Sequence, residues 1–208
     1  DCLVGSEMCI RDRIRLMIKM QFQIGVARRI CETIGTLNMP SVSEKLGQMA
    51  AQAAMVEGLV YGMESGGGYY NGYYVPDRNL MYTAQVLTQQ LYPEFITSMR
   101  EIAGGGLIML PSSVKDFENP EIARYIHATQ NSAVGTSEEK VKFMKLAWDA
   151  IGSEFASRHT QYEMFYAGAQ FVTRGHALRT YDWNRSKILV DDILNSYNLE
   201  DMFEENNI

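Results

Sequence analysis

The sequence predicts an all-α protein, most simply an antiparallel bundle of four long helices with short additional helices. Apolar residues recur at steps of three and four along most of the chain, so that roughly 60% of it reads as helical, against about a third in an average protein. Convincing strand-like alternation is missing from the sequence. Glycine clusters separate the helical segments, as expected for connections between bundle helices.

Composition and charge narrow the functional classes. The 208 residues are 46% apolar and 21% charged, and 25 acidic against 19 basic residues give a net charge of −6. This acidic balance argues against partners such as nucleic acid or anionic membrane surfaces, which both select basic patches. Apolar runs stay shorter than the ~18 residues that a membrane-spanning helix needs. The chain is long enough for one large domain with a substantial core.

The segment 1–13 reads DCLVGSEMCIRDR and resembles translated sequencing-adapter text rather than a signal peptide. We therefore expect 1–13 to be non-native, 14–199 to form the helical domain and 200–208 to form a tail. Two of the three cysteines lie in 1–13, which leaves Cys31 alone in the domain. A single cysteine predicts neither an intrachain disulfide nor a cysteine-rich metal site, and favours a reducing, cytoplasmic compartment.

Two long helices are expected before residue 66. The first starts at Ile14 and ends at Asn38-Met39-Pro40, and its apolar stripe is Ile14, Met17, Ile18, Phe22, Val26, Ile30 and Ile34. Ser41 and Glu44 predict a capping box for the second helix. Its apolar stripe is Leu46, Met49, Ala53, Val56, Val60 and Met63, and its second face carries Ala50, Ala51, Ala54, Gly58 and Gly62. A helix with two such faces is typical of a central position or a subunit interface, so we expect a homo-oligomer.

The middle of the chain combines turns with shorter elements. Asn71-Gly72 predicts a tight turn within a plain connector, 66–77. A helix is expected over 78–103, with a kink or break at Pro93. The segment 107–113 is short and apolar, and is expected to run extended through the interior. Asn119 followed by proline predicts a helix over 120–128.

The last third of the chain is expected to hold one long helix from Thr136 to Phe165 and a final helix over 184–197. In the first of these helices, the apolar residues recur at steps of three and four that place Arg158 on or beside the seam of the bundle, where a charge needs a partner. The spacing leaves two readings open: an ion pair to Glu154 or Glu163, or an anchor for an anionic group of a cofactor. The sequence FYAG at 165–168 is either a helix end, with Gly168 as the left-handed residue, or a flat surface for a planar ligand.

Other catalytic signals are weak. The three histidines, His127, His159 and His176, lack the spacing of metal ligands, so no metal site is expected. Adjacent carboxylates such as Asp191-Asp192 read as solvated helix positions. No nucleophile is accompanied by a base and an orienting group. The residues by themselves therefore predict an oligomeric helical bundle without a self-contained catalytic set.

Four segments resemble the C-terminal region of the 4-hydroxyphenylacetate 3-monooxygenase oxygenase component family. They are GGGLIMLPSS (104–113), DFENPEIARYI (116–126), KLAWDAIGSEFASRHTQYEMFYAGA (145–169) and GHALRTYDW (175–183). The resemblance implies an architecture like that of acyl-CoA dehydrogenases, with a helical domain, a β-barrel and a C-terminal four-helix bundle. This chain corresponds to the last part, and the family's bundles assemble dimers or tetramers.

The resemblance also implies an activity and a site. Family members use FAD in its reduced form FADH2, supplied by a separate flavin reductase, and O2 to hydroxylate a 4-hydroxyphenyl substrate at the ortho position, giving a catechol. The flavin contacts map onto Phe165, Tyr166, Ala167 and Gly168, with Arg158, His159, Ser112 and Ser113 as weaker candidates. Catalytic residues belong to upstream domains, so the fragment alone is expected to be inactive. Departure from the family pattern at Ala169-Gln170 leaves the phenol open.

Two alternatives remain beside the hydroxylase. One is a fragment of a flavoprotein like 4-hydroxybutyryl-CoA dehydratase, which shares the fold and adds an iron–sulfur cluster. The other, from a different functional class, is a non-catalytic helical module that serves oligomerisation.

Overall fold

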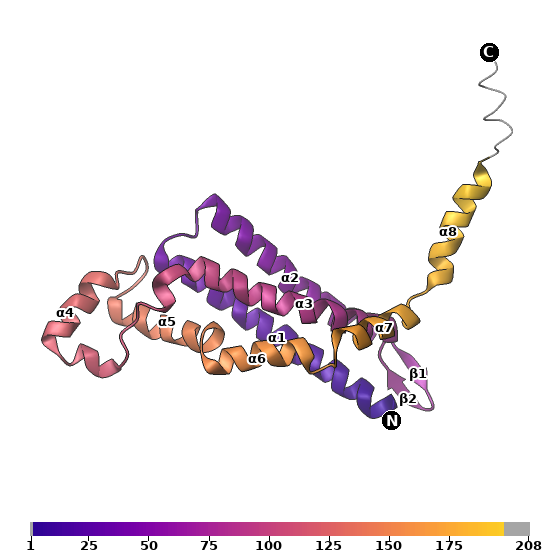
Figure 1. Ribbon diagram of the computed structural model, residues 1–208, viewed down its shortest axis with the longest axis horizontal. Coiled ribbons are helices and arrows are strands. Elements are labelled where there is room, and N and C mark those ends of the chain that lie inside the picture. Colours follow the sequence, from indigo (N-terminus) through magenta and orange to yellow (C-terminus); the bar gives the residue numbers. More distant parts are fainter. Residues whose placement is uncertain (1, 198–208) are drawn as a thin grey trace, which may run out of the picture.

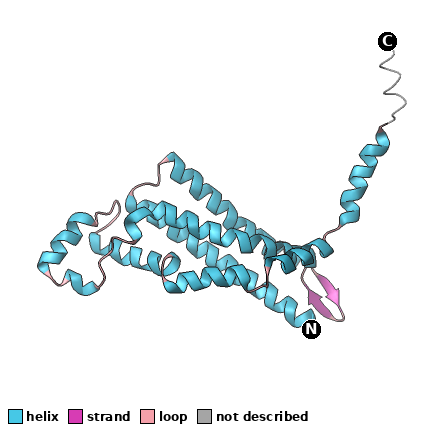
Figure 2. Cartoon of the chain, in the orientation of Figure 1, coloured by secondary structure: helices cyan, strands magenta, loops and turns pink. Residues whose placement is uncertain are grey.

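The computed structural model describes residues 2–197, with side chains from Ile10 onward, and confirms the predicted helical bundle (Figures 1 and 2). Three long helices lie side by side: α1 (Cys2–Ile34), α2 (Pro40–Ser65) and α3 (Arg78–Ala103). The helices α5 (Ser137–Ile151) and α6 (Glu154–Phe165) follow each other along the fourth position. The short helix α4 (Pro120–Thr129) lies at one end of the bundle and α7 (Gln170–Thr180) near the other.

The connection between α1 and α2 differs from the prediction. Helix α1 extends back to Cys2, and the assignment of 1–13 as non-native stays a prediction. The expected capping box of Ser41 and Glu44 is wrong, because Pro40 already occupies the start of α2 and Met39 is the N-cap, without a side-chain cap. Proline suits this place because the first helical N–H has no partner within the helix.

A small hairpin joins α2 to α3 and confirms the tight turn at Asn71-Gly72. Strands β1 (Gly68–Tyr70) and β2 (Tyr73–Val75) pair antiparallel, and the two turn residues have positive φ angles of 49° and 82°. Positive φ at both central positions is what a type I′ turn requires.

Helix α3 continues through Pro93 without breaking, and it begins where the side chain of Asp77 accepts a hydrogen bond from the backbone N–H of Leu80 at 2.7 Å. It ends at Ala103, followed by the 3-10 helix η1 (Gly104–Leu107), so the predicted glycine stop is confirmed. The expectation that 107–113 crosses the interior is wrong. Leu107 is buried, but Ile108 and Met109 are 77% and 64% exposed, because the segment turns along the surface towards η2 (Val114–Phe117).

The helix expected from Thr136 to Phe165 is two helices. Thr136 begins α5 with a capping box, as the sequence signal indicates. Gly152 then ends α5, and the Ser153 side chain accepts a hydrogen bond from the Ala156 N–H at 3.2 Å, which caps α6. A glycine followed by a good N-cap residue favours such a break even where the apolar steps run on.

The chain closes with α7, which the periodicity does not predict, and with α8 (Trp183–Ser196), close to the helix expected over 184–197. The expected helix over 120–128 is confirmed as α4, whose N-cap Asn119 accepts hydrogen bonds from the N–H groups of Glu121 and Ile122. The predicted tail 200–208 lies outside the described residues.

The core lies between α1, α2, α3 and α5. Its largest fully buried apolar side chains are Leu16, Met20, Ile30, Met49, Met63, Tyr92, Phe95, Met99, Met144 and Ile151. On α1 the predicted stripe is partly wrong: Val26 and Ile30 are buried, but Ile14, Ile18 and Phe22 are 38–54% exposed. Helix α1 is apolar on two faces, and periodicity alone cannot select the face that α2 and α3 cover.

Within residues 2–197, no helix combines the length and the hydropathy that crossing a bilayer requires. The same residues hold no cluster of three or more His, Cys, Asp or Glu side chains arranged to bind a metal ion.

Candidate functional site

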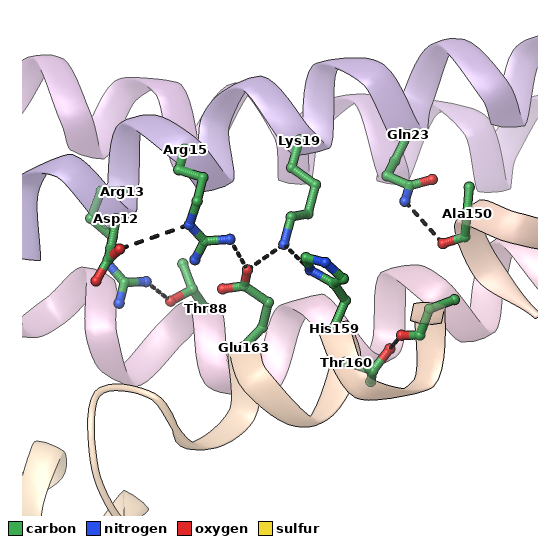
Figure 3. A network of polar contacts seen from close by, with 11 residues as sticks. Asp12, Arg13, Arg15, Lys19, Gln23, Thr88, Ala150, His159, Thr160 and Glu163 are labelled. Atoms are coloured by element: carbon green, nitrogen blue, oxygen red, sulfur yellow. Dashed lines mark hydrogen bonds and ion pairs between the residues drawn. The ribbon is translucent and has the colours of Figure 1, made fainter. Parts of the chain in front are cut away.

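A buried ion cluster joins α6 to α1 (Figure 3). The Glu163 carboxylate is fully buried, and its Oε1 accepts hydrogen bonds from Arg15 Nη1 at 2.8 Å and from Lys19 Nζ at 2.5 Å. Both cations lie on α1, one helical turn apart, so that they point at the same carboxylate. An isolated buried carboxylate is costly, and this one is compensated by two charged donors.

Burial shapes the ionisation of this cluster. Desolvation lowers the pKa of the Lys19 ammonium, although the Glu163 carboxylate beside it acts in the opposite direction. Burial also opposes the charge of Arg15, but the hydrogen bond and the charge of Glu163 together outweigh it, and the pKa of Arg15 is raised. The cluster therefore holds a firm ion pair between Arg15 and Glu163, with Lys19 as a cation that releases its proton more readily than a surface lysine.

His159 extends the cluster towards the surface. Its Nδ1 lies 3.1 Å from Lys19 Nζ, and its ring meets Phe155 edge-on at 4.3 Å between centroids. Burial, followed by the positive charge of Lys19, lowers the pKa of His159. A cavity of about 190 Å³ opens beside these groups and reaches Gln23 and Tyr92.

Arg158 takes no part in this cluster. Its side chain is exposed, and it lines a shallow cavity of about 270 Å³ together with Phe155, His159 and Tyr162. The proposed ion pair between Arg158 and Glu163 is wrong, because among the described residues the carboxylate pairs with Arg15 and Lys19 instead. Arg158 precedes this carboxylate by five residues on α6, which places the two side chains on different faces of the helix, and Arg158 is exposed.

The four residues implied as flavin contacts end α6 and begin the turn into α7. Phe165 is the last helical residue and is 49% exposed. Tyr166 follows as the C-cap, and the Gly168 N–H donates to the Phe165 carbonyl at 2.9 Å. Gly168 has a φ of +104°, and a Cβ built there meets no atom within 4 Å. Glycine is needed here for its backbone angle, and the space where a side chain would lie is open.

This aromatic edge is tied to the ion cluster through stacked rings. The rings of Tyr162 and Tyr166 lie 4.9 Å apart and 10° from parallel. The Arg15 guanidinium lies 4.8 Å above the Tyr162 ring, so that it contacts both the ring and the Glu163 carboxylate. Tyr166 Oη is buried and has no hydrogen-bond partner among the described residues.

A buried amide on α3 supports the same turn from below. Gln89 is 1% exposed, and its Nε2 donates to the Gly168 carbonyl at 2.9 Å. Its Oε1 accepts a hydrogen bond from the Thr173 hydroxyl, also at 2.9 Å, and Thr173 is fully buried on α7. Three elements, α3, the turn and α7, therefore meet at one side chain.

Ser112 and Ser113 lie elsewhere. Ser113 caps η2, where its side chain accepts from the Lys115 N–H and the Asp116 carboxylate accepts from the Ser113 N–H. It lines a cavity of about 460 Å³ between η2 and α5, whereas Ser112 lines one of about 400 Å³ beside α4. Both serines line cavities beside η2 or α4, and α4 lies at the opposite end of the bundle from α7 (Figure 1). The structure therefore does not bring them to the aromatic edge.

Sequence reasoning missed Gln89, Thr173 and the partners of Glu163. A signal was present on α1, where Arg15, Lys19 and Gln23 recur at four-residue steps and mark a polar line along one helix face. On α3, Gln85, Thr88 and Gln89 interrupt an otherwise apolar buried face. Polar residues on a buried helix face indicate specific partners, but periodicity does not identify those partners.

We expect Glu163→Gln to lower the free energy of unfolding by about 3 kcal/mol, because it leaves two cations near a neutral amide. Urea denaturation followed by circular dichroism measures this loss. Glu154→Gln, on the exposed start of the same helix, is the matched control and is expected to cost less than about 1 kcal/mol. Equal effects of the two variants would contradict the importance of the buried ion pair.

Lowering the pH is expected to destabilise the fold through His159. The pKa of this imidazole is lowered in the folded state, so the unfolded chain binds its proton first as pH falls through about 6.5. Stability contributed by the neutral ring is present above that pH and decreases below it. Urea unfolding from roughly pH 7.5 to 5.5 should show a shallower decline for His159→Gln than for the unsubstituted chain. Identical slopes would exclude this role of His159.

A family model and individual relatives of known name agree on the family to which this chain is similar. The model of the family described as "4-hydroxyphenylacetate 3-hydroxylase C terminal" matches residues 7–195. The chain is 34% identical over 167 residues to a 4-hydroxyphenylacetate 3-monooxygenase oxygenase component of Pseudomonas aeruginosa, and 33% identical over 190 residues to one of Escherichia coli. These matches cover 79% and 88% of the chain, but only 32% and 36% of the relatives. The chain thus spans about a third of their length.

Solved structures give the same result for the fold. The oxygenase component HpaB of 4-hydroxyphenylacetate 3-monooxygenase, crystallised with FAD and 4-hydroxyphenylacetate, matches with a TM-score of 0.86 and 26% identity over 91% of this chain and 40% of its own. A 4-hydroxybutyryl-CoA dehydratase from N. maritimus matches with a TM-score of 0.80 over 94% of this chain and 40% of its own, at 21% identity, a likeness of fold alone. The chain belongs to the 4-hydroxyphenylacetate 3-hydroxylase C-terminal family.

Proposed function

We propose that this chain is the C-terminal bundle of a two-component, flavin-dependent aromatic hydroxylase. Such an enzyme uses FADH2 and O2 to add one oxygen ortho to the hydroxyl of a 4-hydroxyphenyl substrate, giving a catechol. The observation that carries the proposal is the family match over residues 7–195, together with homologous oxygenase components from two bacteria. A structural relative at 26% identity was crystallised with FAD, which supports the choice of cofactor.

The edge formed by residues 165–168 fits a planar cofactor. The open space beside the Gly168 Cα lets a flat ring approach the backbone. Phe165 offers a half-exposed aromatic face, and Tyr166 Oη is a buried hydroxyl that has no hydrogen-bond partner within the part of the chain that the structure describes. We propose that Phe165, Tyr166, Ala167 and Gly168 contact FAD, whose reduced ring would supply the electrons that activate O2.

In this proposal, the residues of the bundle bind and orient the cofactor. Phe165 and Gly168 form a surface for the ring, and the buried ion pair of Glu163 keeps the end of α6 in place. We assign no proton transfer to this chain. A separate flavin reductase is proposed as the partner, because the curated relatives are named oxygenase components.

A homo-oligomer, a dimer or a tetramer, is part of the proposal. The small face of α2 supports it: Ala50, Ala51, Ala54 and Gly58 are exposed in the monomer, on the side opposite the buried stripe. Small residues allow a second helix to approach closely, as bundle interfaces require. The dehydratase alternative has the support of fold likeness alone.

Hydroxylation assays test the function. The full-length protein, given FADH2 and O2, is expected to convert 4-hydroxyphenyl compounds into catechols, detected by chromatography. The isolated 208-residue chain should show a strong helical circular dichroism signal and no conversion, because it corresponds to only a third of its relatives. Conversion by the isolated chain would refute the expectation that the bundle needs the upstream domains. The proposed function would be refuted if the full-length protein gave no catechol, or gave it without reduced flavin.

Substitutions at Gly168 test the site. Gly168→Ala and Gly168→Phe both strain the positive φ, but only the phenylalanine covers the open face. In the full-length protein we expect Gly168→Phe to raise the Kd for FAD at least about tenfold above that of Gly168→Ala, measured by fluorescence titration. Equal affinities of the two variants would remove residues 165–168 from the flavin site.

A further inference from the structure

We propose that Gln89 is a positioning residue for FAD, which acts through Gly168 and touches neither the cofactor nor the substrate. This inference rests on the proposed function, because it concerns the same edge at 165–168. It starts from the hydrogen bonds that Gln89 makes to Gly168 and Thr173, at 2.9 Å each. Neither sequence motifs nor spacing assign a role to this glutamine.

The orientation of the Gln89 amide is fixed by its partners. The Gly168 carbonyl only accepts, so it must face the NH2 group of Gln89, which turns Oε1 towards the Thr173 hydroxyl. That hydroxyl shares its single proton between Gln89 Oε1 at 2.9 Å and the Gln170 carbonyl at 3.0 Å. Both side chains are at most 1% exposed, and Gly168 is half-buried, so the access of water to these bonds is restricted. In such surroundings hydrogen bonds are strong and an unpartnered carbonyl is costly. The two hydrogen bonds of Gln89 to Gly168 and Thr173, called the Gln89 bridge below, therefore favour a single conformation of the turn.

The turn needs such support. Gly168 lacks a side chain that could pack, and a glycine samples both signs of φ when nothing holds it. Gln89 connects its carbonyl to α3, a long helix that packs against α1, α2, α6 and α7. The rigidity of the bundle is thereby transmitted to the ligand-facing end of α6.

The bridge also decides which groups the turn presents. The 168–169 peptide is planar and trans, so its N–H points opposite to its carbonyl. With the Gly168 carbonyl held inward by Gln89, the N–H of Ala169 faces away from α3, and Ala169 is exposed. A donor N–H is thus available beside the aromatic edge for an oxygen atom of the cofactor.

A packing role alone does not explain a glutamine at this position. The buried side of α3 also carries Leu91, Tyr92 and Phe95, and an apolar residue at position 89 would avoid the cost of burying an amide. Glutamine combines a donor for Gly168 with an acceptor for Thr173 at the required reach. Glutamate lacks the donor when ionised, and leucine lacks both groups.

The first test compares two buried glutamines in the full-length protein. Gln89→Leu is expected to raise the Kd for FAD about tenfold, measured by fluorescence titration at a temperature where the variant is folded. Gln23→Leu is the matched control: Gln23 is 4% exposed and donates to the Ala150 carbonyl at 3.3 Å, on another part of the bundle. It should lower stability and leave the Kd within about twofold of the unsubstituted value.

A second variant gives a signature that general destabilisation would not produce. In Gln89→Glu, a protonated carboxyl can donate to the Gly168 carbonyl, whereas the carboxylate cannot. Burial raises the pKa of a carboxyl, so lowering the pH from about 8 to about 5.5 should return the variant's Kd towards that of the unsubstituted protein at each pH. A ratio of the two Kd values that does not change with pH would overturn the inference.

The combined outcomes separate this inference from the proposed function. An unchanged Kd in Gln89→Leu, or equal losses in Gln89→Leu and Gln23→Leu, would overturn the positioning role. If Gly168→Phe weakens FAD binding in the same assay, the proposed site still holds. If neither the Gly168 nor the Gln89 variants alter the Kd, the flavin site itself is refuted.

Discussion

The buried carboxylate of Glu163 is the constraint on which the arrangement of this bundle depends. It is fully enclosed, so α6 must lie where Arg15 and Lys19 of α1 reach it. A shift of α6 by one helical turn would separate the charges and leave a buried carboxylate without partners, at a cost of several kcal/mol. The position of α6 along α1 determines where in the bundle its C-terminal end lies. Phe165 and Tyr166, which form the aromatic edge, stand at that end.

Helix α3 links the other parts of the site. It contacts α1, α2, α6 and α7, and its buried side carries Gln85, Thr88 and Gln89 among large apolar residues. Buried polar groups lower stability unless they are satisfied, but satisfied ones exclude alternative packings. In this protein the Gln89 side chain holds the turn at Gly168, a glycine with positive φ and open space where a Cβ would lie, at the edge that we propose for the cofactor.

Much apolar surface remains uncovered in the monomer. Helix α8 extends away from the bundle (Figure 1), and its Leu189, Ile193 and Leu194 side chains are 58–63% exposed. On α1, Ile18 and Phe22 are about half exposed. Contiguous apolar faces of this kind are typical of interaction surfaces. They agree with the proposed homo-oligomer, and with a chain that spans about a third of its relatives.

The sequence by itself determined the helical class, most helix boundaries and the family motifs, because these depend on local periodicity, caps and turn residues such as Asn119 and Asn71-Gly72. It also pointed to residues 165–168, through the family resemblance. Only the tertiary structure decided which face of α1 is buried, that α5 and α6 are separate, and that Glu163 pairs with α1 rather than with Arg158. It alone brought Gln89 to Gly168, 79 residues apart. The physical reason is that a buried charge or amide is satisfied by whichever group the packing brings near, and periodicity describes faces, not partners.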